Sequence, residues 1–254
     1  VTGAADPRSI GWGIARALAV AGADVVLNDL PDKNRALGRR AEELRELGRR
    51  SVAAPADVTR ADQVEDMLRV AHECLGPLDI ACSNAGIIRW EHLAEITPHN
   101  LRAMIDVNLK GNMYVCQGAA RQMIAAGHGG RIIVTSSVQV GAHFPVTPVY
   151  GATRAAMPIF VGGLALELAP HGITVNHVGP GWVRTAINDA APDQQTPEDI
   201  EAQRAAVPLR RPGQPDEIAQ AVVYFASDEA AYTTGAFLRV DGGLGISKYP
   251  YGRP

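Results

Sequence analysis

Apolar and polar positions along the chain follow two alternating patterns. Short apolar runs with the character of buried parallel strands lie at 23–28, 51–56, 78–82, 131–135, 172–178 and 235–240. Longer stretches with apolar residues at helical spacing lie at 33–48, 61–75, 97–126, 149–169 and 215–227. This alternation predicts a single α/β domain over residues 1–254, a doubly wound Rossmann fold whose mostly parallel sheet of seven strands is flanked by helices.

The chain opens on Val1-Thr2-Gly3, which has the pattern of the last residues of a strand followed by a turn. In a doubly wound sheet the first strand is central and pairs with the second and fourth strands, so its loss would leave two buried neighbours unpaired. We therefore expect the natural protein to carry roughly ten further residues upstream, to complete a short first strand. The first strand is largely absent from the sequence as given.

A glycine-rich turn follows and opens the first helix. Gly3, Ser9, Ile10 and Gly11 supply mostly small residues, which let backbone N–H groups at a helix N-terminus approach a pyrophosphate. Ser9 can also cap that helix. The spacing therefore predicts a phosphate-binding turn.

An acidic residue, Asp29, falls at the carboxyl end of the next predicted strand. A carboxylate there can accept both hydroxyls of an adenosine ribose and repels a 2′-phosphate, which favours NAD over NADP. Arg8, in the lengthened turn, could instead reach a phosphate, so NADP stays open as the less favoured cofactor.

The stretch from Ser136 to Arg154 carries the strongest candidate chemistry. Ser137 follows a predicted strand, and Tyr150 and Arg154 lie four residues apart on one face of a predicted helix. A phenol ordinarily keeps its proton until about pH 10. A cation about 4 Å away, at an effective dielectric of about 20, favours the phenolate by about 4 kcal/mol. This pattern predicts Tyr150 as a general acid/base, with Ser137 binding the same substrate oxygen.

The order Ser137, Tyr150 and a cation at 154 resembles the short-chain dehydrogenase/reductase superfamily, whose motif is Ser followed by Tyr-x-x-x-Lys. Arg154 stands where that family has lysine. The resemblance implies that this residue favours the phenolate, holds the nicotinamide ribose and passes protons to a water chain. Arginine keeps the charge and can hold a ribose, but it is a planar fork that stays protonated, so the resemblance leaves the proton relay open.

The resemblance implies further site residues. Asn108 matches the family's fourth catalytic residue, an asparagine that binds the relay water. Adenine-binding residues would be Asp57 and Val58, and a turn beside the cofactor would be Asn84-Ala85-Gly86. Residues that match the segment meeting the nicotinamide are Pro180, Gly181, Val183 and Thr185, with the Val183 main chain on the carboxamide and the Thr185 hydroxyl on the amide or phosphate.

Substrate contacts are expected from Gln139, His143 and Trp182, beneath a lid at about 186–207 and beside a C-terminal tail at 244–254. Within the family the chain looks like bacterial glucose 1-dehydrogenases. The implied reaction is hydride transfer between a secondary alcohol, such as a sugar, and the nicotinamide. Two alternatives remain: reduction of a 3-oxoacyl thioester or ketone, and a catalytically weak dinucleotide-binding protein in which Arg154 is a disabling change.

Composition narrows the class of protein. The chain has 254 residues, and its net charge of −3 gives no basic footprint for nucleic acid or a membrane surface. No apolar run looks long enough to span a bilayer, and no signal-like segment opens the chain. Cys74, Cys82 and Cys116 lack metal-ligand spacing and are expected to be reduced core thiols of a cytoplasmic protein without a metal.

The predicted helix at 149–169 is apolar nearly all round, with Glu167 the main exception. Such a helix must be covered on both sides. One side can face the sheet, so we expect a second subunit on the other and a homo-oligomer, a tetramer.

Overall fold

The computed structural model describes residues 1–186 and 196–246. Its strands are all parallel and form two pieces of sheet, β1-β2 and β3-β4-β5-β6 in spatial order. The strands are β1 (Val25–Leu27), β2 (Ser51–Ala53), β3 (Ile80–Ser83), β4 (Gly130–Thr135), β5 (Ile173–Pro180) and β6 (Phe237–Val240). Each lies within or overlaps one of the apolar runs that predicted it, which confirms the α/β class.

The residues Val1 and Thr2 join the two pieces of sheet. The Asn28 N–H, just after β1, donates to the Val1 carbonyl oxygen at 2.9 Å, and the Thr2 N–H donates to the Cys82 carbonyl oxygen in β3 at 3.1 Å. These residues therefore occupy the central position, between the predicted second and fourth strands, that the sequence assigns to a first strand. With this segment the six described strands form one twisted parallel array.

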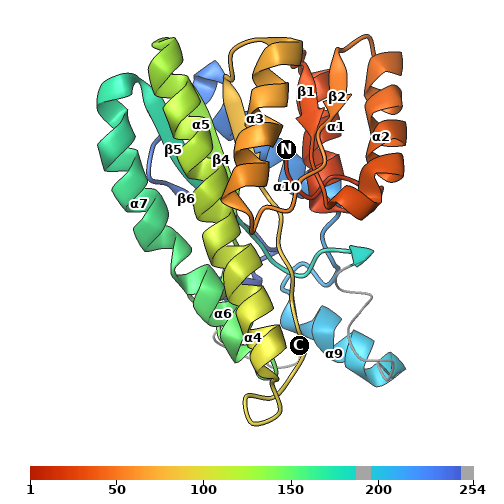
Figure 1. Cartoon of the computed structure of the whole chain (residues 1–254). Coiled ribbons are helices and arrows are strands. Elements are labelled where there is room, and N and C mark those ends of the chain that lie inside the picture. Colours follow the sequence, from red (N-terminus) through yellow and green to blue (C-terminus); the bar gives the residue numbers. More distant parts are fainter. Residues whose placement is uncertain (187–195, 247–254) are drawn as a thin grey trace.

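Helices cover both faces of this array (Figure 1). In Figure 1 the columns α5–α4 and α7–α6 run side by side, and their α4 and α6 ends extend beyond the sheet. The helices are α1 (Ile10–Val20), α2 (Asn34–Glu46), α3 (Ala61–Leu75), α4 (Pro98–Ile105), α5 (Asn112–Ala126), α6 (Pro148–Ala155), α7 (Met157–Leu168), α9 (Pro197–Ala206) and α10 (Pro215–Ala226).

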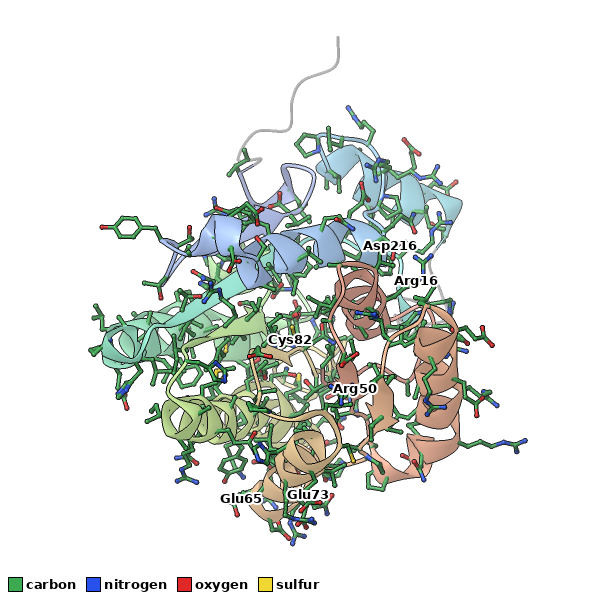
Figure 2. The ribbon with its side chains drawn as sticks, turned by 90° about the horizontal axis from the view of Figure 1, so that it is seen from above. Arg16, Arg50, Glu65, Glu73, Cys82 and Asp216 are labelled. Atoms are coloured by element: carbon green, nitrogen blue, oxygen red, sulfur yellow. The ribbon has the colours of Figure 1, made fainter. Side chains whose placement is uncertain are left out.

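Neighbouring strand residues point to opposite faces and build two separate cores. Cys82 and Ile133 pack with α1 and α10, whereas Ala81 and Ile132 pack with α5 and α7. In the view from above, Cys82 lies near the centre of the molecule, between the helical layers (Figure 2). The sheet is thus buried on both faces, as its continuous apolar runs predict.

The predicted long helix at 97–126 is interrupted. Thr97 caps it as expected, accepting from the Asn100 N–H at 3.1 Å. Between α4 and α5, however, residues Asp106–Gly111 form a π-helical turn. The apolar helix predicted at 149–169 also breaks, at Ala156, because Pro158 lies in the first turn of α7 and cannot continue a preceding helix.

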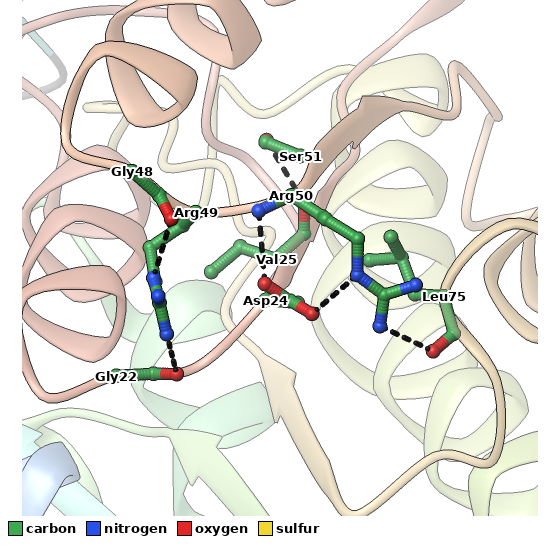
Figure 3. Close-up of polar contacts among 8 residues, drawn as sticks. All are labelled: Gly22, Asp24, Val25, Gly48, Arg49, Arg50, Ser51 and Leu75. Carbon is green, nitrogen blue, oxygen red and sulfur yellow. Dashed lines mark hydrogen bonds and ion pairs between the residues drawn. The ribbon is translucent and has the colours of Figure 1, made fainter.

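Two arginines in the loop between α2 and β2 bind residues that precede β1 and the end of α3 (Figure 3). The Arg50 Nε donates to Asp24 Oδ2 at 2.7 Å and its Nη2 donates to the Leu75 carbonyl oxygen at 3.1 Å. Arg49 reaches the Gly22 carbonyl oxygen at 2.8 Å. Arg50 holds the pKa of the Asp24 carboxyl below its usual range. Figure 2 shows a second surface pair, Arg16 and Asp216, where α1 meets α10.

Taken together, residues Pro148–His171, which include α6 and α7, are by length and composition apolar enough to cross a membrane, with a mean hydropathy of 1.3. The expectation that no apolar run reaches that length is therefore wrong. The same composition is found in the packed helices of globular proteins, and α7 packs against β5 here. Only 28% of the most apolar window is buried, so much of this surface remains open.

Candidate active site

A cleft of about 640 Å³ opens at the carboxyl ends of the strands. Parallel strands place their following loops at this edge, which is where ligands bind in open α/β sheets. The cleft collects residues predicted from every part of the sequence: Gly3, Ser9, Ile10, Asp29, Asp57, Val58, Asn84, Ala85, Gly86, Ser137, Tyr150, Arg154, Pro180, Gly181, Val183 and Thr185. Within the described part of the chain, Gly11, Asn108, Gln139, His143 and Trp182 do not line it.

The glycine-rich turn forms one end of the cleft. Gly3 has a φ of +71°, which favours glycine, and a Cβ at Gly11 would overlap the Gly3 carbonyl. Gly11 therefore acts beneath the cleft wall by allowing the turn to close. Ser9 caps α1 as predicted, accepting from the Trp12 N–H at 3.0 Å.

Asp29 supports this turn as well as facing the cleft. Its Oδ2 accepts from the Ala5 N–H at 3.0 Å, and its Oδ1 accepts from the Leu30 N–H at 2.9 Å. Lys33, Arg39 and Arg40 also line the cleft. Sequence analysis missed these cations because they looked like the solvated face of a charged helix.

The turn at 84–86 is tied to the start of the chain. The Thr2 hydroxyl accepts from the N–H groups of Asn84 and Ala85, each at 2.9 Å. The Asn84 side chain donates back to the Thr2 carbonyl oxygen at 2.9 Å. The sequence does not predict a role for Thr2 in this turn. Only the tertiary contact between the start of the chain and residues 84–86 indicates that role.

Asp57 and Val58 follow β2 on the same edge. The Asp57 carboxylate accepts from the Thr59 N–H at 2.9 Å, so it shapes its own turn. Val183 and Thr185 are buried and also line the cleft, and a parallel bridge joins Val183 to Gly213. The two predicted ends of a dinucleotide site therefore lie in one continuous cleft.

Ser137 and Tyr150 also line this cleft. Ser137 is buried, and its hydroxyl accepts from the Gln139 N–H at 3.1 Å. Tyr150 is half-buried at the start of α6. Both residues therefore line the same cleft, and their joint action on a substrate oxygen stays a prediction.

Arg154 is the unusual member of this group. Its side chain belongs to a residue only 4% exposed, and its guanidinium carbon lies 5.0 Å from the centroid of the Tyr150 ring. Nη1 donates to the Thr135 carbonyl oxygen at 3.3 Å and Nη2 donates to Asn108 Oδ1 at 3.4 Å, whereas Nε has no hydrogen-bond partner in the structure. Among the described residues no carboxylate lies in ion-pair range, so this buried cation lies beside a phenol without an acidic partner.

Asn108, predicted as the fourth catalytic residue, is fully buried behind the cleft. Its Oδ1 accepts from the Ile87 N–H and its Nδ2 donates to the Ile87 carbonyl oxygen, both at 2.8 Å. Its main-chain oxygen accepts from Asn112 Nδ2 at 2.8 Å. Asn108 therefore does not face the cleft itself but contacts two residues that line it, Arg154 and Ile87.

The residues predicted to contact substrate, Gln139, His143 and Trp182, do not lie together in the cleft lining. His143 is exposed, Trp182 is half-buried, and the Gln139 amide contacts the Thr147 hydroxyl. Residues 187–195 of the expected lid and 247–254 of the expected tail lie outside the described residues. The other part of the lid contains α9.

The cysteines differ from expectation at one position. Cys82 and Cys116 are buried thiols, and burial raises their pKa values to about 11 and about 12. Cys74 is exposed, which corrects the prediction of three core thiols; it lies on α3, where helical spacing alone did not separate the rim of the buried face from its centre. No group of potential metal ligands occurs in the ranges 1–186 and 196–246.

Comparison with known proteins assigns the chain to a family. A family model described as enoyl-(acyl carrier protein) reductase matches residues 3–245. A crystal structure of a short-chain type dehydrogenase/reductase from Mycobacterium marinum superimposes with a TM-score of 0.88 at 34% identity, covering 96% of this chain and 93% of that one. The chain belongs to the short-chain dehydrogenase/reductase superfamily. It is therefore an oxidoreductase by family.

Relatives within this superfamily carry more specific names. An L-rhamnose 1-dehydrogenase (NAD(P)(+)) of a Sphingomonas species is 37% identical over 252 residues, covering 97% of this chain and 95% of that protein. A gluconate 5-dehydrogenase from Burkholderia cenocepacia, crystallised with NADP and tartrate, has a TM-score of 0.89 at 35% identity and covers 96% of this chain and 93% of that one. These names give no support to a preference for NAD over NADP, or to glucose in particular.

Proposed function

We propose that this short-chain dehydrogenase/reductase is an NAD(P)-dependent enzyme that transfers a hydride between a secondary alcohol carbon of a sugar or sugar acid and the nicotinamide. The observation that carries the proposal is that Ser137, Tyr150 and the buried Arg154 line one cleft, with the Arg154 guanidinium over the Tyr150 ring. The similarity to dehydrogenases named for rhamnose and gluconate supports the substrate class. Glucose remains one candidate within it.

The cleft fits a dinucleotide. The tight approach of Gly11 to the Gly3 carbonyl brings the start of α1 close to the cleft, where backbone N–H groups can meet a pyrophosphate. Asp29 accepts one N–H on each oxygen and keeps lone pairs for ribose hydroxyls. Val183 and Thr185 would hold the nicotinamide end. When bound, the nicotinamide supplies the hydride acceptor or donor.

In the oxidative direction the alcohol gives up a proton and a hydride and becomes a carbonyl. Ser137 would hold the alcohol oxygen, and Tyr150 would take its proton as the carbon–hydrogen bond breaks. Arg154 would offset the negative charge of the phenolate. Because a guanidinium keeps its proton, it can stabilise this charge but cannot carry the proton onward.

We infer that both nicotinamide cofactors are accepted. Asp29 disfavours a 2′-phosphate, but its charge is partly offset by two backbone N–H donors, and Lys33 and Arg39 line the same end of the cleft. Both cations are exposed and can move toward an additional phosphate. The similarity to a protein crystallised with NADP agrees with this inference.

We also propose a cytoplasmic homo-oligomer, a tetramer, in which the exposed face of α7 forms one of the interfaces. On α7, Ile159 is 82% exposed and Leu166 is 80% exposed. Gly162 and Gly163 lie between them with open space around their backbone. A flat apolar stripe of this kind favours close approach of a second helix.

A turnover screen tests the proposal. The protein is mixed with NAD or NADP and a panel of sugars, sugar acids and simple secondary alcohols, and in the reverse direction with 3-oxoacyl thioesters, while absorbance of the reduced nicotinamide is followed. We expect sugar-class oxidation that is lost by about 10³-fold in Tyr150→Phe with cofactor binding retained. Faster reduction of acyl thioesters would favour the reductase alternative, and cofactor binding without turnover of any substrate would favour the catalytically weak one.

A further inference from the structure

A chain of buried polar side chains runs from the cleft wall into the core behind it. Arg154 Nη2 donates to Asn108 Oδ1, Asn112 Nδ2 donates to the Asn108 main-chain oxygen at 2.8 Å, and the Ser83 hydroxyl donates to Asn112 Oδ1 at 2.7 Å. The four residues are 4%, 0%, 2% and 2% exposed in that order from Arg154 to Ser83. Buried polar groups of this kind are costly unless paired, so their alignment indicates a specific requirement.

The chain passes through the π-helical turn at Asp106–Gly111. Single π turns inside α-helices occur mostly where function needs a displaced residue. Here the turn places the Asn108 amide so that it contacts Ile87 on both its oxygen and its nitrogen while its oxygen also meets Arg154. The Asn112 amide, in the first turn of α5, supplies a further donor to the Asn108 carbonyl at the end of this distorted segment.

Arg154 depends on this arrangement more than a paired cation would. In the described part of the chain its guanidinium has only neutral acceptors, Thr135 and Asn108, and its Nε is unpartnered. A small shift of the Asn108 side-chain oxygen would therefore remove one of the two hydrogen bonds that hold the Arg154 guanidinium. The guanidinium would then be free to leave the face of the Tyr150 ring.

We propose that Asn112 is a positioning residue for Arg154, acting through Asn108, with Ser83 holding the Asn112 amide in the correct orientation. The inference rests on the proposed oxidoreductase function, since it concerns how the cation beside Tyr150 is held. It assigns a role in the site to two residues that the cleft itself does not contain. A plain core-packing role for Asn112 would predict a general loss of stability with no link to position 154.

The test is a double-mutant cycle between positions 112 and 154. Asn112→Ala is made in the wild type and in Arg154→Lys, and kcat, KM and the pH dependence of kcat/KM are measured for each. With Arg154 present we expect Asn112→Ala to lower kcat about tenfold, at little change in substrate KM, and to move the rising limb of the pH profile upward. In the Arg154→Lys background, where the shorter ammonium cannot reach Asn108 as a fork does, we expect a loss below about twofold.

Cys116→Ala is the matched control, because Cys116 is buried one turn along the same helix, beside Ser83, and has no amide with which to hold Asn108. It should lower the melting temperature as Asn112→Ala does and leave the pH profile in place. Equal losses of kcat from Asn112→Ala in both backgrounds, or an unmoved pH profile, would overturn the proposal.

A second readout needs no turnover. NADH or NADPH affinity, followed by nicotinamide fluorescence, should weaken several-fold in Asn112→Ala and in Arg154→Ala, with no further loss when the two are combined. Additive losses would contradict the positioning role. If the wild type binds the cofactor but oxidises no alcohol, the proposed function fails while this cycle still decides the role of Asn112.

Discussion

At the scale of single residues, the site depends on how one cation is seated. The spacing of Tyr150 and Arg154 could be predicted from the sequence, because four residues along a helix bring two side chains onto one face. The seat could not be predicted. The Arg154 guanidinium is surrounded by Gly86 and Asn108, which are far away in sequence, and it lies over the ring of the phenol.

Gly86 gives the first prediction at this scale. A Cβ at this position would overlap Arg154 Nη2, so Gly86→Ala should push the guanidinium off the Tyr150 ring and lower kcat/KM at least tenfold. Combining it with Arg154→Lys should restore most of that loss, because the ammonium lacks the colliding nitrogen. Steady-state kinetics of the two single variants and the double variant measure this, and a double variant no better than Gly86→Ala would refute the seating argument.

At the scale of elements, the sequence predicted where strands and helices lie more accurately than how they are distorted. Apolar runs located all six described strands, and Thr97 located the start of α4. The π turn was hidden because Asn108 within it is held by the Ile87 N–H, a tertiary contact that helical periodicity does not record. The unfavourable asparagine in mid-helix was the one local signal of it.

A buried histidine where β5 pairs with β6 gives a prediction about how the free energy of unfolding depends on pH. His177 in β5 is 1% exposed and stacks on Phe237 of β6, with ring centroids 4.6 Å apart. Burial lowers the pKa of His177 to about 4 from an ordinary value of 6.5. The unfolded chain therefore binds the proton first as pH falls, so this residue removes stability between pH 6.5 and 4, by about 3 kcal/mol in total.

Chemical denaturation at several pH values checks this prediction. The neutral variant His177→Gln should show a shallower fall in the free energy of unfolding across that window than the wild type. Parallel curves for the two proteins would show that the strand-buried imidazole is not the source of the acid sensitivity.

At the scale of the whole molecule, the doubly wound topology could be predicted because alternating strands and helices leave few alternatives. The cleft and its chemistry followed from that topology, since loops at one edge of the sheet collect residues from every segment. The substrate could not be predicted in the same way. The predicted substrate residues His143 and Trp182 lie on loops, whose conformation no periodic pattern fixes.

Assembly gives the prediction at this scale. Leu166→Glu places a charge in the exposed apolar stripe of α7 and should convert the proposed tetramer into smaller species. Val20→Glu, at a similarly exposed position with 69% accessibility at the end of α1, is the control and should leave the assembly intact. Light scattering after size exclusion reports the mass, and an unchanged mass for Leu166→Glu would exclude this face as the interface.

The central claim is that the charge of Arg154 supports proton transfer by Tyr150. Its most direct test compares kcat/KM of the wild type, Arg154→Lys and Arg154→Met for the oxidation of one alcohol. The guanidinium carbon lies 5.0 Å from the centre of the Tyr150 ring. A charge about 5 Å away, at an effective dielectric of about 20, is worth about 3 kcal/mol, or about two orders of magnitude in rate. We expect Arg154→Met to lose about 100-fold and Arg154→Lys to stay within about tenfold of the wild type. Wild-type activity in a folded Arg154→Met that still binds the cofactor would contradict the account.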